Sequence, residues 1–563
     1  MPSEVGQQGR CARQHLNVPA KLLKNTVLYS NTKFARRTTC TEGLAARRAV
    51  AAEQAAFANF IPMEPGIILL SILGYFALVF VIARLTTRGR RENLQDFFLA
   101  GRSAPWPLVA FGMIGTSLSG VTFISVPGAV GKSSMAYFQM VLGYLVGYLV
   151  IAFLLLPLYY RLNLTSIYSY LAKRFGGYSY RTGAFYFLLS RSLGSAARLY
   201  LVAVVLQFAV FDALQVPFAV TVGVTLLLIL LYTGRGGIRT IIWTDTLQTA
   251  FMLLAAGLTV WALLPAFGNR GLLEVVTSST NAQIFFFEDP DAPAYFWKQF
   301  IAGALITLVM TGLDQDMMQK NLSIRTLRGA QWNVLSYSLG LVVVNLLFLG
   351  LGVLLYAYAA EQQIALPEKA DRLYPLIALD YLPLGVGLLF ILGLIAAAYS
   401  SADGSLTALT TSFCIDFLGM DPESSQQNLR TRKRVHAGMT LWFFAVILLF
   451  RAAESWDTGD LSVITLVLSL AGYTYGPLLG LYAFGLFVRR RPADRWVPLV
   501  GVLAPLVTLL IQLNSEAWLG FRLGHERIAL NGALTFVGLF LLPLQAATGN
   551  GISVTKNGAK ASG

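Results

Sequence analysis

Cysteine and histidine are nearly absent from this 563-residue chain, which contains three of each. Cys11 and Cys40 lie in a polar N-terminal stretch, and Cys414 lies in an apolar run. So few thiols can build neither a disulfide framework nor a four-ligand zinc site. We also find no nucleophile paired with a base and no phosphate-binding loop. The sequence therefore predicts a protein that is not an enzyme and that needs no organic cofactor.

Charge is also scarce. Only 13% of the residues are charged, whereas 56% are hydrophobic, and the mean hydropathy is +0.62. This composition excludes most soluble folds and is typical of an integral membrane protein. The net charge of +15 would suggest nucleic-acid binding in a soluble protein, but Lys and Arg in a membrane protein mainly report its orientation. We expect the bilayer as a partner and no nucleic acid.

Apolar runs long enough to cross a membrane as helices recur from residue 66 to residue 545. Windows of roughly 20 residues predict thirteen transmembrane helices in an all-α protein. These are residues 66–84, 105–129, 137–160, 183–211, 217–233, 241–266, 297–318, 331–360, 382–416, 435–451, 461–488, 496–513 and 528–545.

Basic residues are distributed unequally over the two sets of alternate loops, at about three to one. Lys and Arg accumulate on the cytoplasmic side of membrane proteins. The richer set, which includes the 430–434 and 489–495 clusters and Lys320, is therefore assigned to the cytoplasm. We predict a multi-pass protein of the plasma (inner) membrane with its N-terminus outside and its C-terminus in the cytoplasm.

Residues 1–62 fit this topology poorly, because they are basic, lack a long apolar run and would have to cross the membrane. Met63 leads directly into the first apolar helix. We interpret residues 1–62 as a disordered basic extension that is absent if translation starts at Met63. The alternative is a disordered tail that is retained.

Two predicted spans contain polar or flexible residues, which need a reason in hydrocarbon because unsatisfied polar groups there cost several kcal/mol. The second span contains GTSLSG at 115–120, which indicates either an interrupted helix facing a cavity or a close contact between helices. The ninth span contains SSADGS at 400–405. Its hydroxyls and carboxylate suit a hard cation, although paired serines also bond back to helix carbonyls.

Ionisable residues within the spans form a third group of candidates. They include Asp245, Asp314 and Asp316, together with Arg191 and Arg198 in the fourth span. Arg198 lies near the midpoint of its span, too deep to reach water easily. It either pairs with a protein carboxylate, for which Asp245 is the suggested partner, or receives an anionic solute, and the residues alone favour the pair.

Seven short segments occur in the same order as in a known family. They are DFFLAGR (96–102), SIYSYLAKRFG (166–176), GGIRTIIWTD (236–245), GLDQ (312–315), QK (319–320), SSAD (400–403) and YGPLLGL (475–481). Through these segments the chain resembles the sodium:solute symporter family over almost its whole length from Met63. Each segment is weak evidence alone, but the ordered set together with thirteen spans leaves little room for chance.

The resemblance implies a LeuT-type fold, in which two inverted five-helix repeats form the core. One helix precedes this core and two follow it. The implied divisions are a leading transmembrane helix and cytoplasmic loop (63–100), a ten-helix transporter core (101–490), two peripheral helices (491–548) and a cytoplasmic tail (549–563).

The resemblance also implies a sodium site between the first and eighth core helices. Position by position, its ligands would be the carbonyls of Gly115, Leu118 and Ala397 and the hydroxyls of Ser400 and Ser401. Some members hold a second sodium, using the aspartate that corresponds to Asp245. Because Asp403 and Gly404 replace the serines of that site, we predict no second sodium. Asp245, Asp403 and Asp314 are interpreted as coupling or structural charges.

The solute is expected beside the broken first core helix. Ser117 and Thr122 from that helix, Met310 and Thr311 from the sixth, and Arg198 are the candidate contacts. Sugar-transporting relatives have an aromatic residue where Met310 stands, and amides where Ser117 and Thr122 stand. A hexose is therefore disfavoured, and a carboxylate such as an amino acid, a monocarboxylate or a sialic acid is favoured if Arg198 reaches the cavity.

The resemblance thus implies sodium-coupled secondary active symport of a small organic solute by alternating access. The alternatives are a sodium/sugar symporter, a transport-like sensor and a passive ion channel, of which the last would conduct without solute. The chain after residue 545 is too short for a kinase module, which disfavours the sensor. The sequence leaves the identity of the solute, the stoichiometry and the oligomeric state open.

Overall fold

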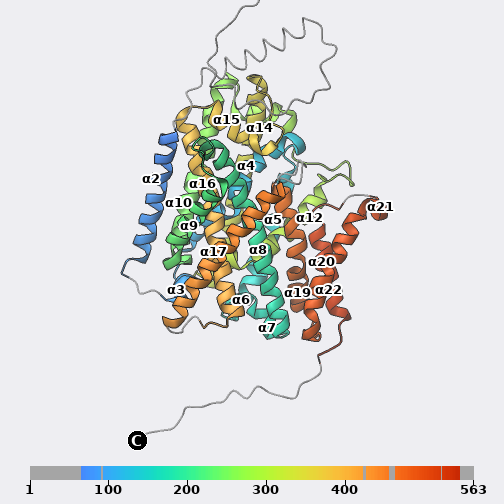
Figure 1. The fold of residues 1–563 in the computed structure, drawn as a ribbon. Coiled ribbons are helices and arrows are strands. Elements are labelled where there is room, and N and C mark those ends of the chain that lie inside the picture. The colour runs from blue at the N-terminus through green and yellow to red at the C-terminus, as the bar shows by residue number, and fades with distance from the viewer. Residues whose placement is uncertain (1–64, 90–92, 422–425, 455–462, 521–522, 546–563) are drawn as a thin grey trace, which may run out of the picture. The chain divides into compact units, whose positions relative to one another are not determined.

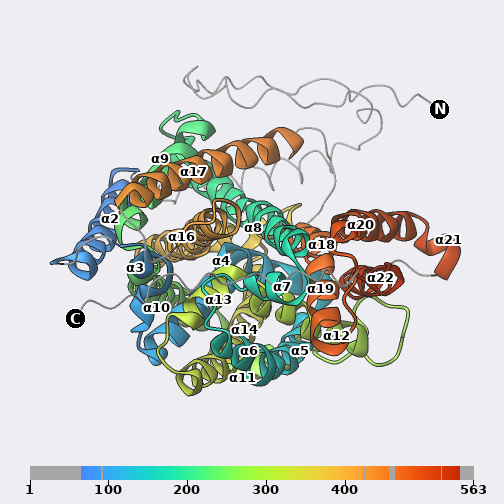
Figure 2. The ribbon, with the colours of Figure 1, turned by 90° about the horizontal axis from the view of Figure 1, so that it is seen from below.

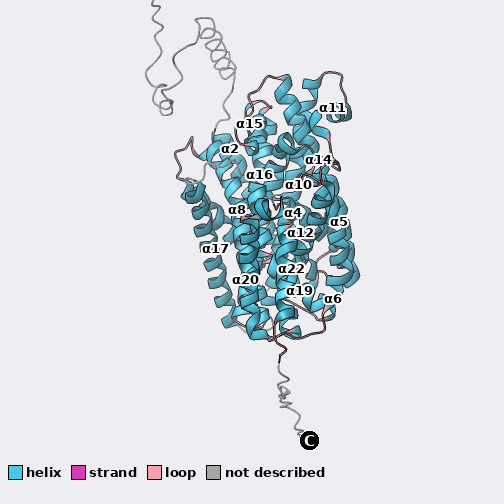
Figure 3. Ribbon diagram, turned by 90° about the vertical axis from the view of Figure 1, so that its right-hand side faces the viewer, coloured by secondary structure: helices cyan, strands magenta, loops and turns pink. Residues whose placement is uncertain are grey.

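The computed structural model describes residues 65–89, 93–421, 426–454, 463–520 and 523–545. Within these ranges the chain is helical and contains no β-strand (Figure 3). The predictions for residues 1–62 and for the tail at 549–563 fall outside the described residues.

Each predicted span corresponds to one helix or to a chain of consecutive helices. The long helices are α2 (Pro65–Thr87), α4 (Trp106–Ser133), α5 (Tyr137–Val150), α8 (Gly177–Leu206), α9 (Phe218–Gly236), α10 (Ile238–Leu263), α12 (Phe296–Thr307), α14 (Leu327–Glu361), α16 (Leu384–Ser412), α17 (Gln426–Glu454), α18 (Val463–Thr474), α19 (Gly476–Phe487), α20 (Val497–Leu513) and α22 (Arg527–Leu541). Shorter helices connect or extend them, namely α3 (Leu94–Leu99), α6 (Leu156–Arg161), α7 (Ser169–Arg174), α11 (Leu272–Ser278), α13 (Gln315–Leu322), α15 (Leu373–Asp380) and α21 (Ser515–Leu519).

The count of thirteen spans is not confirmed. Among the described residues, ten helices are long and apolar enough to cross a membrane, and the pair of α12 and α13, bent by 63°, makes up to eleven. The range 461–488 falls short because α18 ends at Thr474 and α19 restarts with Pro477 in its first turn. Proline lacks the N–H that would continue the helix from the preceding turn. The last predicted span, α22, is only 15 residues long.

Burial separates the central helices from the peripheral ones. In the most apolar stretch of α4, 89% of the residues are buried, whereas only 28% are buried in that of the span Asp494–Leu513, which contains α20. The helices α2 and α20 expose large apolar side chains such as Leu70 and Leu513, as expected for helices that face lipid. Figures 1 and 2 show α2 at one edge of the helix bundle and α20 and α22 at the opposite edge.

The central helix α4 packs against α10, α14 and α16. Gly115 permits the close approach of α10, because a Cβ at this position would overlap the side chain of Thr249. The small-residue contact that the sequence offered as one interpretation of this stretch is therefore present. It places the polar part of α4 in the middle of the bundle.

The interruption predicted in α4 is also present. Ser119 has φ 48° and ψ 175°, which lies outside the helical region and which side chains other than glycine rarely adopt. A second break separates α12 from α13, where the π-helical turn η6 (Leu308–Gly312) leads to Asp314. Breaks of this kind are tolerated at membrane depth where the backbone faces protein or a cavity rather than lipid.

Candidate functional site

A cavity of about 110 Å³ lies beside the break in α4. Its walls come from α4, α5, α8, α12 with η6, α14 and α18. The wall is mixed, with hydroxyl, amide and guanidinium groups among aliphatic side chains, which is the composition expected of a site that orients a small polar ligand.

All five side chains proposed from the sequence as solute contacts line this single cavity. Ser117 and Thr122 come from α4, Met310 and Thr311 from η6, and Arg198 from α8. These segments are far apart in sequence. The fold brings them together around one cavity.

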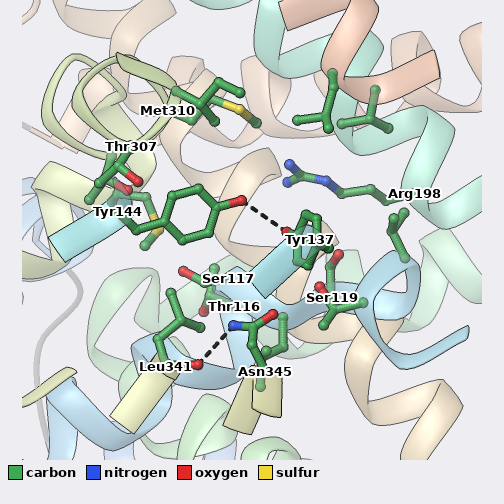
Figure 4. A pocket seen from close by; sticks show the side chains of 18 of the residues that line it. Thr116, Ser117, Ser119, Tyr137, Tyr144, Arg198, Thr307, Met310, Leu341 and Asn345 are labelled. Atoms are coloured by element: carbon green, nitrogen blue, oxygen red, sulfur yellow. Dashed lines mark hydrogen bonds between the residues drawn. The ribbon is translucent and has the colours of Figure 1, made fainter. Parts of the chain in front are cut away.

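Arg198 is a cation on the cavity wall. Figure 4 shows its guanidinium projecting toward Tyr137 and Tyr144, whose hydroxyls lie 2.9 Å apart. Within the described part of the chain Arg198 forms no ion pair. The pairing with Asp245 suggested by the sequence is wrong, because Asp245 pairs with Lys320 instead.

Several cavity residues were missed by sequence reasoning. Tyr137 and Tyr144 come from α5, and Asn345 from α14 donates through Nδ2 to the carbonyl of Leu341 at 2.8 Å. The sequence could have identified Asn345, because it is a single amide within an apolar run. Such a group is expected on the buried face of a membrane helix. The tyrosines carried none, because aromatic residues are common throughout the spans.

The two segments proposed to bind sodium meet where α4 crosses α16. Thr116 Oγ1 and Ser400 Oγ lie 3.2 Å apart, so Gly115 and Ser401 belong to adjoining turns. Ser401 is 1% exposed, and its hydroxyl has no hydrogen-bond partner. Buried polar groups are normally satisfied. An orphaned hydroxyl here fits the interpretation that a cation completes its coordination.

The other proposed ligands, Leu118 and Ala397, are buried on the same two helices. Carbonyls in the last turn before a helix break lose their usual N–H partners. Leu118 immediately precedes the break at Ser119. The arrangement can therefore offer carbonyl and hydroxyl oxygens to a hard cation, with no soft ligand nearby in the proposed set.

A buried network of charges adjoins these segments. Lys320 Nζ lies 2.7 Å from Asp245 Oδ2 and 3.8 Å from Asp316 Oδ1, and Arg191 pairs with Asp316 and, at 3.6 Å, with Asp314. Asp314 also caps α13, because it accepts hydrogen bonds from two backbone N–H groups of the first turn. Lys320 was assigned to a cytoplasmic loop from the sequence, and this is wrong, since the residue is 1% exposed.

Asp403 is the remaining buried carboxylate of the predicted set. It accepts hydrogen bonds from Tyr232 Oη at 2.8 Å and from the N–H of Gly404 at 2.6 Å. Among the described residues it has no ion-pair partner. Gly404 leaves space for the neighbouring charges, because a Cβ there would meet the Asp316 carboxylate.

A family model described as the sodium:solute symporter family matches residues 97–494, which include both helix breaks and the whole charge network. The chain belongs to this family. It is therefore a multi-pass membrane transporter rather than an enzyme, with sodium as the co-transported ion, as the sequence indicated.

Curated relatives extend over most of the chain. A sodium/sialic acid symporter of Aliivibrio fischeri is 27% identical over 472 residues, which cover 78% of this chain and 87% of that one. A sodium/sialic acid symporter of Proteus mirabilis is 27% identical over 465 residues, covering 78% and 88%. Sodium-coupled monocarboxylate transporter 1 of Mus musculus is 25% identical over 442 residues, covering 77% and 69%.

The fold is shared with a solved structure of a Na⁺-coupled sialic acid symporter in a substrate-bound, outward-open state. The TM-score is 0.72 with 20% sequence identity, covering 85% of this chain and 99% of that one. The LeuT-type fold is thereby confirmed. Sodium-coupled symport follows from membership of the family.

Proposed function

We propose that this symporter takes up an organic acid, whose carboxylate binds to Arg198. The observation that supports this most strongly is a cavity-facing guanidinium without an ion-pair partner among the described residues. A buried cation that lacks a counter-ion is costly, and an anionic solute would supply one. Arginine is suited to this role because its planar fork can donate two hydrogen bonds to one carboxylate.

The rest of the wall fits an acid that also carries polar groups. Hydroxyls of Ser117, Ser119 and Thr122 lie on α4, and Tyr137 and Tyr144 lie near the guanidinium (Figure 4). The names of several relatives specify acids, namely sialic acids and monocarboxylates. We therefore propose a sialic acid as the first solute to test and simple monocarboxylates as the second.

In the proposed cycle, sodium binds between α4 and α16 and holds these helices together while the solute site faces outward. The ligands would be the carbonyls of Gly115, Leu118 and Ala397 with the hydroxyls of Ser400 and Ser401. A cation shifts a conformational equilibrium only by its difference in affinity between the states. Because Ser117 lies between the proposed sodium ligands Gly115 and Leu118 on α4, ordering this segment would also shape the solute site.

We propose that the protein resides in the plasma (inner) membrane with its N-terminus outside and its C-terminus in the cytoplasm. The unequal distribution of basic loop residues supports this orientation. Burial of Lys320 removes one cation from the cytoplasmic count without reversing the bias. Accessibility of single cysteines to an impermeant thiol reagent in intact cells would test it.

Uptake into proteoliposomes tests the function directly. The purified protein is supplied with labelled N-acetylneuraminic acid, lactate, glucose or alanine, under an inward sodium gradient or with potassium in place of sodium. We expect sodium-driven accumulation of an acid and none of glucose. Accumulation of glucose, or uptake of an acid that is independent of sodium, would contradict the proposal, and current without any solute would favour a channel.

A further inference from the structure

The carboxylate of Asp245 is enclosed by groups from three other helices. Its Oδ1 accepts a hydrogen bond from Ser400 of α16 at 2.8 Å. Its Oδ2 accepts from Lys320 of α13 at 2.7 Å and from Thr116 of α4 at 3.1 Å. The side chain of Asp245 is 1% exposed, so water does not compete for these contacts.

The oxygens around Lys320 form the kind of environment that an alkali cation would occupy. The ammonium donates to Thr116 Oγ1 and to Asp245 Oδ2, both at 2.7 Å, and Ser400 Oγ lies within hydrogen-bond distance of Thr116 Oγ1 and of Asp245. A carboxylate with neighbouring hydroxyls is a hard-oxygen ligand set. In this structure the cation that fills it is covalently tethered to α13.

This position adjoins the proposed sodium site. Ser400, which donates to Asp245, is also one of the proposed sodium ligands, and Thr116 is next in sequence to another, Gly115. The orphaned hydroxyl of Ser401 is a second sign that a further cation belongs close by. Two like charges so near each other in a buried region repel strongly, so Lys320 opposes the binding of a second free cation.

The ion-paired part of the network carries more negative than positive charge. Three buried carboxylates, those of Asp245, Asp314 and Asp316, are linked to two cations, Arg191 and Lys320. Asp403 is a fourth buried carboxylate, which accepts hydrogen bonds but has no ion pair among the described residues. Removal of the ammonium would leave one more uncompensated negative charge, at Asp245, and buried carboxylates require a cation or a proton.

We infer that Lys320 is a tethered cation that fills a second alkali-cation site, formed by Asp245, Thr116 and Ser400. The transporter then binds one sodium per chain, and removal of the ammonium opens the second site. This inference rests on the sodium coupling assigned to the family.

Counting bound sodium on the purified full-length chain tests the inference without knowledge of the solute. Equilibrium binding of ²²Na⁺ is measured for the wild type, for Lys320→Met and for the charge-conserving control Lys320→Arg. We expect one sodium per chain for the wild type and for Lys320→Arg. For Lys320→Met we expect two sodium ions per chain.

A double variant, Lys320→Met with Asp245→Asn, identifies the site, because the second sodium should disappear when the carboxylate is also neutralised. If Lys320→Met does not fold, Lys320→Gln takes its place, because it retains a hydrogen-bond donor without the charge. The number of sodium ions bound per chain is then measured for this variant. Two sodiums in the wild type, or one in the charge-neutral single variant that folds, would overturn the inference. A wild type that binds none would instead contradict sodium coupling itself.

Discussion

Thr116 of the broken helix α4 and Ser400 of α16 approach to 3.2 Å between their hydroxyl oxygens. The two residues are 284 positions apart in the chain. Ser400 is itself a proposed sodium ligand, and so are Gly115, next to Thr116, and Ser401, next to Ser400. A sodium bound here would therefore bridge helices from different parts of the core, and its departure would release one from the other.

Removing the hydroxyl of Ser401 should weaken sodium binding. We expect Ser401→Ala to raise the sodium concentration for half-maximal uptake by about tenfold, equivalent to about 1.4 kcal/mol, because the cation loses a ligand. The measurement is initial uptake against external sodium in proteoliposomes. Thr407→Val is the control, since it removes another buried, unpartnered hydroxyl of α16 and should change this value by no more than about twofold. Equal effects of the two variants would contradict the assignment.

Arg198→Gln should lower the apparent affinity for an acidic solute by roughly tenfold to a hundredfold, because a hydrogen bond to a charged group contributes about 1.5 to 3 kcal/mol. Arg198→Lys, which retains the charge but not the planar fork, should lose less. Competition against labelled N-acetylneuraminic acid gives the affinities. Arg270→Gln, at an exposed ion pair with Glu361, serves as the control. An unchanged affinity in Arg198→Gln would show that the carboxylate of the solute does not bind to Arg198.

The backbone at Ser119 should be strained by its side chain. A residue other than glycine in such a region costs on the order of 1 to 3 kcal/mol, so Ser119→Gly should raise the melting temperature of the purified protein. Ser119→Ala is the matched control, because it removes the hydroxyl but keeps the Cβ. We expect no gain from the alanine. Equal stabilisation by both variants would show that the hydroxyl, not the backbone, sets the energy.

The close contact between α4 and α10 at Gly115 should not tolerate a larger side chain at this position. Gly115→Ala places a methyl group against Thr249, and overpacking of this kind costs typically about 1 to 3 kcal/mol. Thr249→Ala removes the atom that would be closest to the new Cβ, Oγ1. The double variant should therefore recover part of the lost melting temperature. A double variant less stable than either single one would indicate that Thr249 does not cause the overlap.

Much of the fold could be predicted because the bilayer imposes simple rules on sequence. Apolar runs of the right length predicted helices that the structure contains, and the glycines and hydroxyls at 115–120 predicted the break observed at Ser119. The span count was less certain, because the broken α18 and α19 and the short α22 depend on local backbone geometry. Hydropathy averages over such breaks.

The sequence alone determined that this is a helical membrane protein and that the segments near Gly115 and Ser400 are its unusual parts, since hydrocarbon penalises polar groups wherever they occur along a chain. Only the tertiary structure decided which charges are partners. Asp245 meets Lys320, 75 residues away, while Arg198 faces the cavity. Pairing depends on how each helix is rotated and on how closely small residues let helices approach, and neither is encoded in the composition of a single span.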